Sequence, residues 1–316
     1  MKGKFQKNLQ KAETFHVALA TEAHWVIFVE AQKIADSERK ALVALLDDPS
    51  PTVRQALRTR FAERGKASAD FLQELARQSD SAVAKHASQY LRELNFTDPV
   101  SEFRDFIHSL NYELETGAIL LARTVNPGVD VGAVCLKLDA MAARCRELIA
   151  EPATAREKCR VLNRVLFHEN GLRGNADNYS DPLNSFLDQV LIREKGIPIS
   201  LSIVYLLVAE RVGLQLEPVG LPGHFMVGCF EESAPFFIDT FNAGILLSAE
   251  ETFDLLKEGS ADASIIDLAP TPVREVLSRC CRNLVRQYTA TDQAAQAQLF
   301  ASFVADFEAA YERNTS

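Results

Sequence analysis

The chain has 316 residues, of which 47% are hydrophobic and 24% are charged, and its formal net charge is −9. This length can bury a sizeable core and hold two domains, and the composition is that of a soluble globular protein. The negative charge disfavours nonspecific binding to nucleic acid or to an anionic membrane surface, and the sequence contains no apolar run long enough to cross a bilayer. We therefore expect neither nucleic acid nor membrane among the partners.

The cysteines indicate the compartment. There are six of them, and none forms a CxxC pair. A chain of this size does not need disulfides, and the basic start of the chain is not followed by the long apolar run of a signal peptide. We therefore expect a reduced, cytoplasmic protein. The cysteines are Cys135, Cys145, Cys159, Cys229, Cys280 and Cys281.

The first hundred residues contain a weak repeat. Leu42 and Val53 are matched about 30 residues later by Leu72 and Val83, and each unit reads as an amphipathic helix, a polar turn and a second helix. This pattern resembles a pair of HEAT-like repeats, and two ordinary helical hairpins would give the same pattern. Two units are too few for an independent solenoid, so we expect them to pack on the domain that comes after them in the chain.

The next part of the chain is predicted to be helical over residues 101–151, with a break at Asn126-Pro127-Gly128. Helices are then expected over residues 181–195 and 199–212, the second apolar almost all round and therefore buried. Short strands are expected after it, and the chain should become helical again after Leu246. The expected strands are residues 217–219, 224–230 and 235–238, and the closing helices are residues 274–288 and 292–311.

Six motifs occur in an order that is similar to the SirB-type transglutaminase-like family. They are Asn163-Arg164-Val165-Leu166-Phe167, Gly171-Leu172-Arg173-Gly174-Asn175, Tyr179-Ser180-Asp181-Pro182-Leu183-Asn184, Gly196-Ile197-Pro198-Ile199-Ser200-Leu201-Ser202, Gly220-Leu221-Pro222-Gly223-His224-Phe225 and Ile238-Asp239. The resemblance covers roughly residues 101–288. It implies a transglutaminase-like or papain-like core, in which a Cys opens a buried helix and a His and an Asp follow on two strands.

This chain departs from that pattern at the nucleophile. The resemblance puts the Cys position at Pro198, whereas His224 and Asp239 keep the positions of the other two groups. The family also tends to have a His where this chain has Asn242. The sequence therefore has the scaffold of a thiol enzyme without its thiol, and no other cysteine has a motif that places it beside His224.

Two serines are alternative nucleophiles. Ser200 or Ser202, with His224 as base and Asp239 orienting it, would form a serine triad near a helix N-terminus. The sequence has no G-x-S-x-G elbow, and short hydroxyl residues near a helix start commonly bond to backbone instead. From the sequence alone, both interpretations stay open.

A polar cluster precedes the buried helix and could form a cleft wall facing His224. Capping and turn formation explain the same residues equally well. Its members are Asn175, Tyr179, Asp181 and Asn184. The histidines are not clustered in a metal-binding spacing, so no metal or other cofactor is predicted.

The sequence thus predicts a mainly helical α+β protein with a small antiparallel sheet. Its expected parts are a HEAT-like helical region over residues 1–97, a transglutaminase-like SirB-type domain over residues 98–289 and a closing helix over residues 290–316. The leading hypothesis is a noncatalytic protein that binds a protein or small ligand at the degenerate cleft. The alternatives are a serine-dependent hydrolase or acyltransferase, and a helical-repeat module that docks a protein partner.

Overall fold

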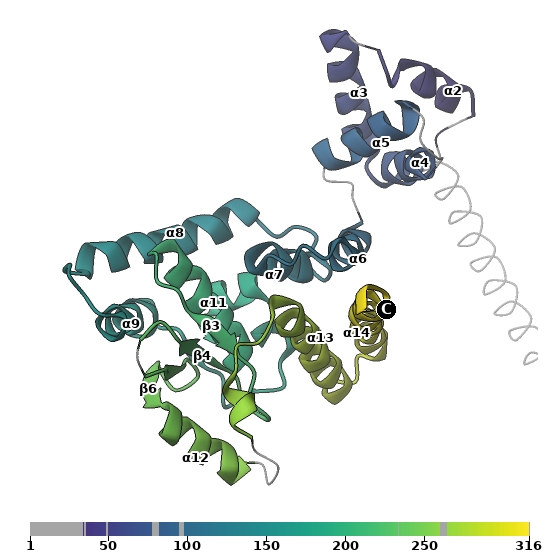
Figure 1. Ribbon diagram of the computed structural model, residues 1–316. Coiled ribbons are helices and arrows are strands. Elements are labelled where there is room, and N and C mark those ends of the chain that lie inside the picture. Colours follow the sequence, from purple (N-terminus) through teal and green to yellow (C-terminus); the bar gives the residue numbers. More distant parts are fainter. Residues whose placement is uncertain are drawn as a thin grey trace, which may run out of the picture. The chain divides into compact units, whose positions relative to one another are not determined.

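The computed structural model describes residues 34, 36–48, 50–77, 82–94, 98–232, 234–259 and 264–315 (Figure 1). The chain divides into two compact units, Met1–Asp98 and Pro99–Ser316. In the described parts of the chain no helix is long and apolar enough to cross a membrane.

The first unit contains two helical hairpins with a core of their own. The helices are α2 (Asp36–Leu45), α3 (Pro51–Arg64), α4 (Lys66–Ala76) and α5 (Ala82–Glu93). Leu42 and Leu72, which match in the repeat, are both buried, whereas Leu45 is 40% exposed and Leu75 only 6%. The turn of the second repeat unit, residues 78–81, lies outside the described residues. The HEAT-like identity of this region stays a prediction.

The second unit begins with four helices. They are α6 (Pro99–Ser109), α7 (Leu114–Arg123), α8 (Val131–Leu148) and α9 (Ala155–Asn163), the last running into a π-helical turn, η1 (Arg164–Glu169). Next come a 3-10 turn, η2 (Pro182–Asn184), α10 (Leu187–Arg193) and α11 (Pro198–Arg211). After the sheet come α12 (Ala249–Gly259), the 3-10 turn η3 (Ile265–Leu268), α13 (Val273–Ala290) and α14 (Ala294–Thr315).

A four-stranded antiparallel sheet follows α11 in the chain. Its strands lie in sequence order: β3 (Glu217–Val219), β4 (Met226–Cys229), β5 (Phe236–Asp239) and β6 (Ile245–Ser248). Because side chains alternate along a strand, Val227 and Ile238 join the main core with α11, whereas Met226 and Phe237 pack with Leu256 of α12. A separate short parallel pair joins β1 (Arg173–Gly174) to β2 (Lys195–Gly196). The sheet is therefore covered on both faces and holds its strand ends in place.

Helix α11 is the centre of the core. Every residue from Pro198 to Ala209 is buried, which confirms the prediction from its apolar sequence. Pro198 stands at the first helical position, where the missing N–H is not needed. The fold of this helix therefore presents its N-terminal end, rather than its flank, to the site.

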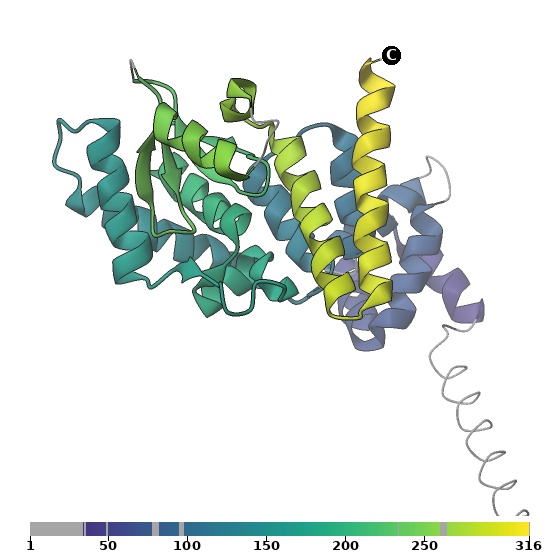
Figure 2. The ribbon, with the colours of Figure 1, turned by 90° about the horizontal axis from the view of Figure 1, so that it is seen from below.

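The closing helices α13 and α14 lie side by side (Figures 1 and 2). Aromatic side chains join them: the rings of Tyr288 and Phe300 stack with centroids 5.5 Å apart, and Phe303 meets Phe103 of α6 edge-on at 4.9 Å. The hairpin is thus fixed to the body of the unit, and it holds one face of α13 toward the site.

The mainly helical α+β class with a small antiparallel sheet is confirmed, and four local predictions were wrong. Residues 101–151 were expected to form two helices, but the chain also breaks between α6 and α7, where Leu110 has a positive φ of 59° that an α-helix cannot continue through. The predicted helix over residues 181–195 is a 3-10 turn followed by the shorter α10, because Phe186 between them is extended. Strand β6 was missed, since its residues are half-exposed at an edge and α12 begins directly after it. His224 precedes β4 rather than belonging to it.

Candidate functional site

The predicted pair of His224 and Asp239 is brought together at the end of the sheet. Nε2 of His224 lies 3.0 Å from Oδ2 of Asp239, and their side chains are 26% and 7% exposed. The pairing of Val227 with Ile238 explains this proximity, because it sets Asp239, the last residue of β5, beside the start of β4, which His224 precedes by two residues. The contact has the distance of an ion pair, but the carboxylate lies too far off the ring N–H direction for a hydrogen bond. The predicted proximity is confirmed, and the predicted hydrogen bond is absent from this geometry.

Asp239 is held mainly by the turn that follows it. Its Oδ1 accepts hydrogen bonds from the backbone N–H groups of Phe241 and Asn242, at 3.1 and 3.2 Å, and its Oδ2 accepts one from Nδ2 of Asn242 at 2.8 Å. Burial acts to raise the pKa of Asp239, but His224 and the Asn242 donors outweigh it, so this pKa lies below its ordinary value. The carboxylate is therefore charged and fixed in orientation.

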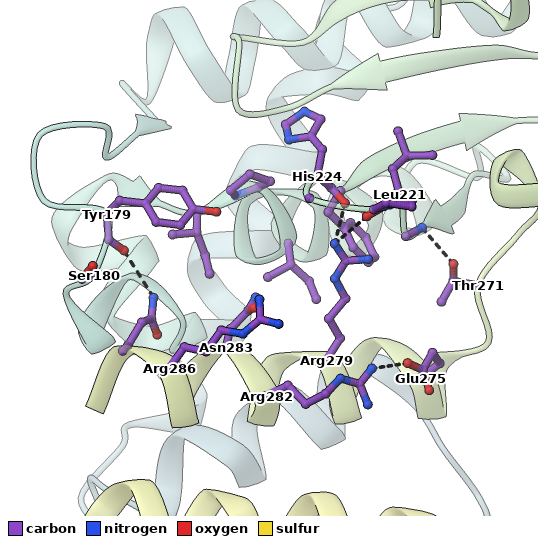
Figure 3. Close-up of a pocket in the computed structure, with 18 of the residues that line it drawn as sticks. Tyr179, Ser180, Leu221, His224, Thr271, Glu275, Arg279, Arg282, Asn283 and Arg286 are labelled. Carbon is purple, nitrogen blue, oxygen red and sulfur yellow. Dashed lines mark hydrogen bonds and ion pairs between the residues drawn. The ribbon is translucent and has the colours of Figure 1, made fainter. Parts of the chain in front are cut away.

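A cavity of about 720 Å³ opens beside His224 (Figure 3). Pro198, to which the sequence resemblance assigns the nucleophile position, lines it together with His224 and Tyr179. Its remaining walls come from the loop before β4 and from one face of α13, represented by Leu221 and Arg279. The volume falls in the range of small-molecule sites. The expected site therefore exists as a cavity, and a proline stands at the end of α11 that faces it.

Both candidate serines are buried and committed to other partners. Oγ of Ser200 accepts the N–H of Ile197 at 3.0 Å and donates to the carbonyl of Asn184 at 2.6 Å. Oγ of Ser202 lies 2.8 Å from Oγ1 of Thr240, which in turn donates to the carbonyl of Pro198 at 3.4 Å. Neither hydroxyl is hydrogen-bonded to His224.

The four residues of the predicted cleft wall have different surroundings. Only Tyr179 lines the cavity. Asn175 and Asn184 are buried and joined to each other, with Nδ2 of Asn175 donating to Oδ1 of Asn184 at 2.9 Å. Asp181 caps η2 through the N–H of Leu183 and pairs with Arg193. These contacts hold the loop that carries Tyr179.

All six cysteines are free, and five of them are buried. Burial raises the pKa of Cys145 to about 11 and those of Cys159 and Cys280 to about 12. Burial also raises the pKa of Cys229, the thiol nearest His224 in sequence. These thiols remain protonated at neutral pH, and a protonated thiol is a poor nucleophile. No cluster of three or more potential metal ligands occurs among the described residues.

Helix α13 contributes residues that the sequence analysis missed. Arg279, Arg282, Asn283 and Arg286 line the cavity across from Tyr179 and His224 (Figure 3). Arg279 donates to the carbonyls of Leu221 and His224, both at 2.7 Å. Burial and the nearby Arg282 lower the pKa of Arg279 below its ordinary value. The sequence could have indicated this basic face, because Arg279, Arg282 and Arg286 are spaced by three and then four residues, and residues at that spacing share one face of a helix.

Comparison with known proteins identifies the central part of the chain. Residues 132–282 match the transglutaminase-like superfamily. This range contains α11, strand β4 with His224 just before it, and strand β5, which ends at Asp239. It also contains the part of α13 that carries Arg279 and Arg282. No solved structure matches the chain.

Several curated proteins are similar in sequence over this part. A UPF0162 protein of Xylella fastidiosa strain Temecula1 is 35% identical over 186 residues, which covers 57% of this chain and 66% of that protein. A UPF0162 protein of Vibrio cholerae is 27% identical over 135 residues, or 42% of this chain and 50% of that protein. Human F-box only protein 21 is 35% identical over 133 residues, or 40% of this chain and 21% of that protein. The chain therefore spans less than two thirds of the length of the relatives it matches.

Proposed function

We propose that the protein, whose residues 132–282 match the transglutaminase-like superfamily, acts by binding at the cavity beside His224, without nucleophilic catalysis. One observation carries this proposal: Pro198, to which the sequence resemblance assigns the Cys position, lies on the wall of the same cavity as His224. A proline side chain has no group that can attack a substrate. The cavity and the imidazole of His224 on its wall remain available for recognition.

The contacts of the two serines support the same proposal over the serine triad. A catalytic hydroxyl needs a hydrogen-bond route to its base. Ser200 serves two backbone groups, and Ser202 serves Thr240. The hydrogen bonds that each hydroxyl makes with neighbouring residues therefore explain why a serine is tolerated in the core.

The finer assignments belong to this proposal as well. The SirB-type identity rests on the order of the six motifs, and a cytoplasmic location rests on six cysteines that form no disulfide. The helical hairpins of the first unit are proposed as a second docking element for a protein partner, on the strength of their repeat pattern alone.

Catalysis is tested by assaying p-nitrophenyl ester hydrolysis and acyl transfer from a glutamine peptide to hydroxylamine. Wild type, His224→Ala and the double variant Ser200→Ala/Ser202→Ala should all react at the background rate. His168→Ala is the matched control, since His168 is exposed and lies outside the cavity lining. Turnover that His224→Ala abolishes and His168→Ala preserves would overturn the noncatalytic proposal.

Binding is tested by ligand-observed NMR with a fragment library. Ser180 is exposed at the cavity, so Ser180→Trp should fill the space with an indole ring. The control is Asp177→Trp, which changes the same loop outside the lining. We expect to find fragments that bind the wild type and the control variant but do not bind Ser180→Trp. A set of binders unaffected by Ser180→Trp would show that the cavity is not the binding site.

A further inference from the structure

One wall of the cavity concentrates positive charge on a protein that is negative overall. Three arginines of α13 line it, although the formal net charge of the chain is −9. The opposite face of this helix is buried through Leu277, Cys281 and other apolar residues. That packing fixes the rotation of α13, so the arginines are presented to the cavity by the core itself.

The three arginines differ in how far their charge is already satisfied. Arg279 is anchored by two backbone carbonyls, which are neutral acceptors. Arg282 pairs with Glu275 and also donates to Oγ of Ser278 at 2.9 Å. In the part of the chain that the structure describes, Arg286 makes no hydrogen bond or ion pair, and neither does the side chain of Asn283.

The acidic residues at the cavity cancel this charge only in part. Glu275 is paired with Arg282, and Oδ2 of Asp267 accepts the backbone N–H of Ser264 at 2.9 Å. Three arginines thus face two carboxylates, which leaves the lining with an excess of positive charge, and neither carboxylate pairs with Arg286. Their influence extends across the cavity, because Arg279 and Arg286 both act to lower the pKa of Tyr179, against the larger effect of its burial. The cavity is therefore electrostatically prepared for an anion.

We propose that the cavity binds a small organic anion whose phosphate or carboxylate group is held by Arg286 and Asn283. A guanidinium matches such a group with two parallel donors, and the amide of Asn283 can add a third. The apolar body of the ligand would lie over Pro198, Ile199 and Leu221, which line the same cavity. This inference rests on the proposed binding function and adds the chemical class of the ligand.

The dimensions of the cavity agree with a ligand of this kind. A helix rises about 1.5 Å per residue, so the Cα atoms of Arg279 and Arg286 are separated by about 10 Å along the axis of α13. An anionic group at Arg286 leaves room for a ring or short chain that extends toward His224. The volume of about 720 Å³ is suited to a whole small molecule rather than to an isolated ion.

The test uses three probes of one shape on the full chain: phenyl phosphate, benzoate and neutral phenol. Binding is followed by chemical-shift changes of backbone amides. We expect at least one of the two anionic probes to bind at least about tenfold more tightly than phenol. Its chemical-shift changes should be centred on α13 and the loop before β4. The tighter of the two anions tells whether phosphate or carboxylate is preferred. Equal binding of all three probes overturns the proposal.

Arg286→Gln should weaken the preferred anion about tenfold and leave phenol binding unchanged. Arg286 is exposed and has no structural contact to lose, so this variant should fold. The matched control is Arg160→Gln on α9, since Arg160 is also exposed and lies outside the cavity lining. Equal weakening by both variants would mean a general charge effect and would reject the site.

The outcome separates this inference from the proposed function. Anion binding that fails while neutral fragments still enter the cavity rejects only the ligand class. Turnover that depends on His224 rejects the noncatalytic proposal and leaves anion binding to be judged by its own measurement.

Discussion

The two buried serines should differ in their contribution to stability. Ser200→Ala leaves the N–H of Ile197 and the carbonyl of Asn184 without partners, and each orphaned buried group costs about 1–3 kcal/mol, so the variant should lose about 2–6 kcal/mol. Ser202→Ala removes one hydroxyl contact, and Thr240 can still donate to the carbonyl of Pro198. That variant should lose about 1 kcal/mol.

The measurement is urea unfolding followed by far-UV circular dichroism. Because the chain has two units, hydrogen exchange of the α11 amides is needed to assign the transition to Pro99–Ser316. Ser200→Thr is a useful control, since it keeps the hydroxyl and adds only a methyl group. The reasoning would be refuted if Ser202→Ala lost as much stability as Ser200→Ala, or if neither variant was destabilised.

Three further predictions concern the thiols, the carboxylate and the core. Iodoacetamide should label the native protein slowly at neutral pH, because burial raises the pKa of thiols such as Cys280 to about 12, and fast labelling that His224→Ala slows would contradict this. The lowered pKa of Asp239 contributes stability that is present above its unfolded value of 3.8 and is lost as the pH falls through the folded value. Urea midpoints measured from about pH 6 down to about pH 3 should therefore fall less steeply in Asp239→Asn than in wild type, and equal slopes would reject the assignment. Val204 is 0% exposed, so Val204→Asp should cost several kcal/mol and unfold this unit, whereas a thermal melt unchanged from wild type would mean that α11 is not buried.

The sequence predicted the features that depend on local pattern. Helix α11 was found from its apolar residues, and its start at Pro198 follows from the geometry of proline. The first three strands of the four-stranded sheet were found within two residues at each end. Strand β6 was missed because Ile245 at its start is 54% exposed and the residues after it lack a buried face.

The site was predictable only in part, because most of its contacts join distant segments. The order of His224 and Asp239 along the chain was enough to predict their proximity. The partners of the serines were not predictable, since Asn184 and Thr240 come from other elements. The arginines of α13 were visible as a helical pattern, but only the packing of α13 against the core determines which side faces the cavity.

The contact between His224 and Asp239 can persist without a nucleophile, since Asp239 also has a structural role. Its carboxylate accepts two backbone N–H groups of the turn after β5, and Asn242 donates to its other oxygen. Asn242 stands where the sequence resemblance predicts a His, and its side chain donates to Asp239 instead. Thr240, between them, ties the same turn to Ser202 and to the carbonyl of Pro198. One hydrogen-bonded corner between α11 and β5 thus joins Pro198, Ser202 and the turn after Asp239. Residue 198 contributes only its backbone carbonyl to this corner, so the corner does not need a nucleophilic side chain at that position.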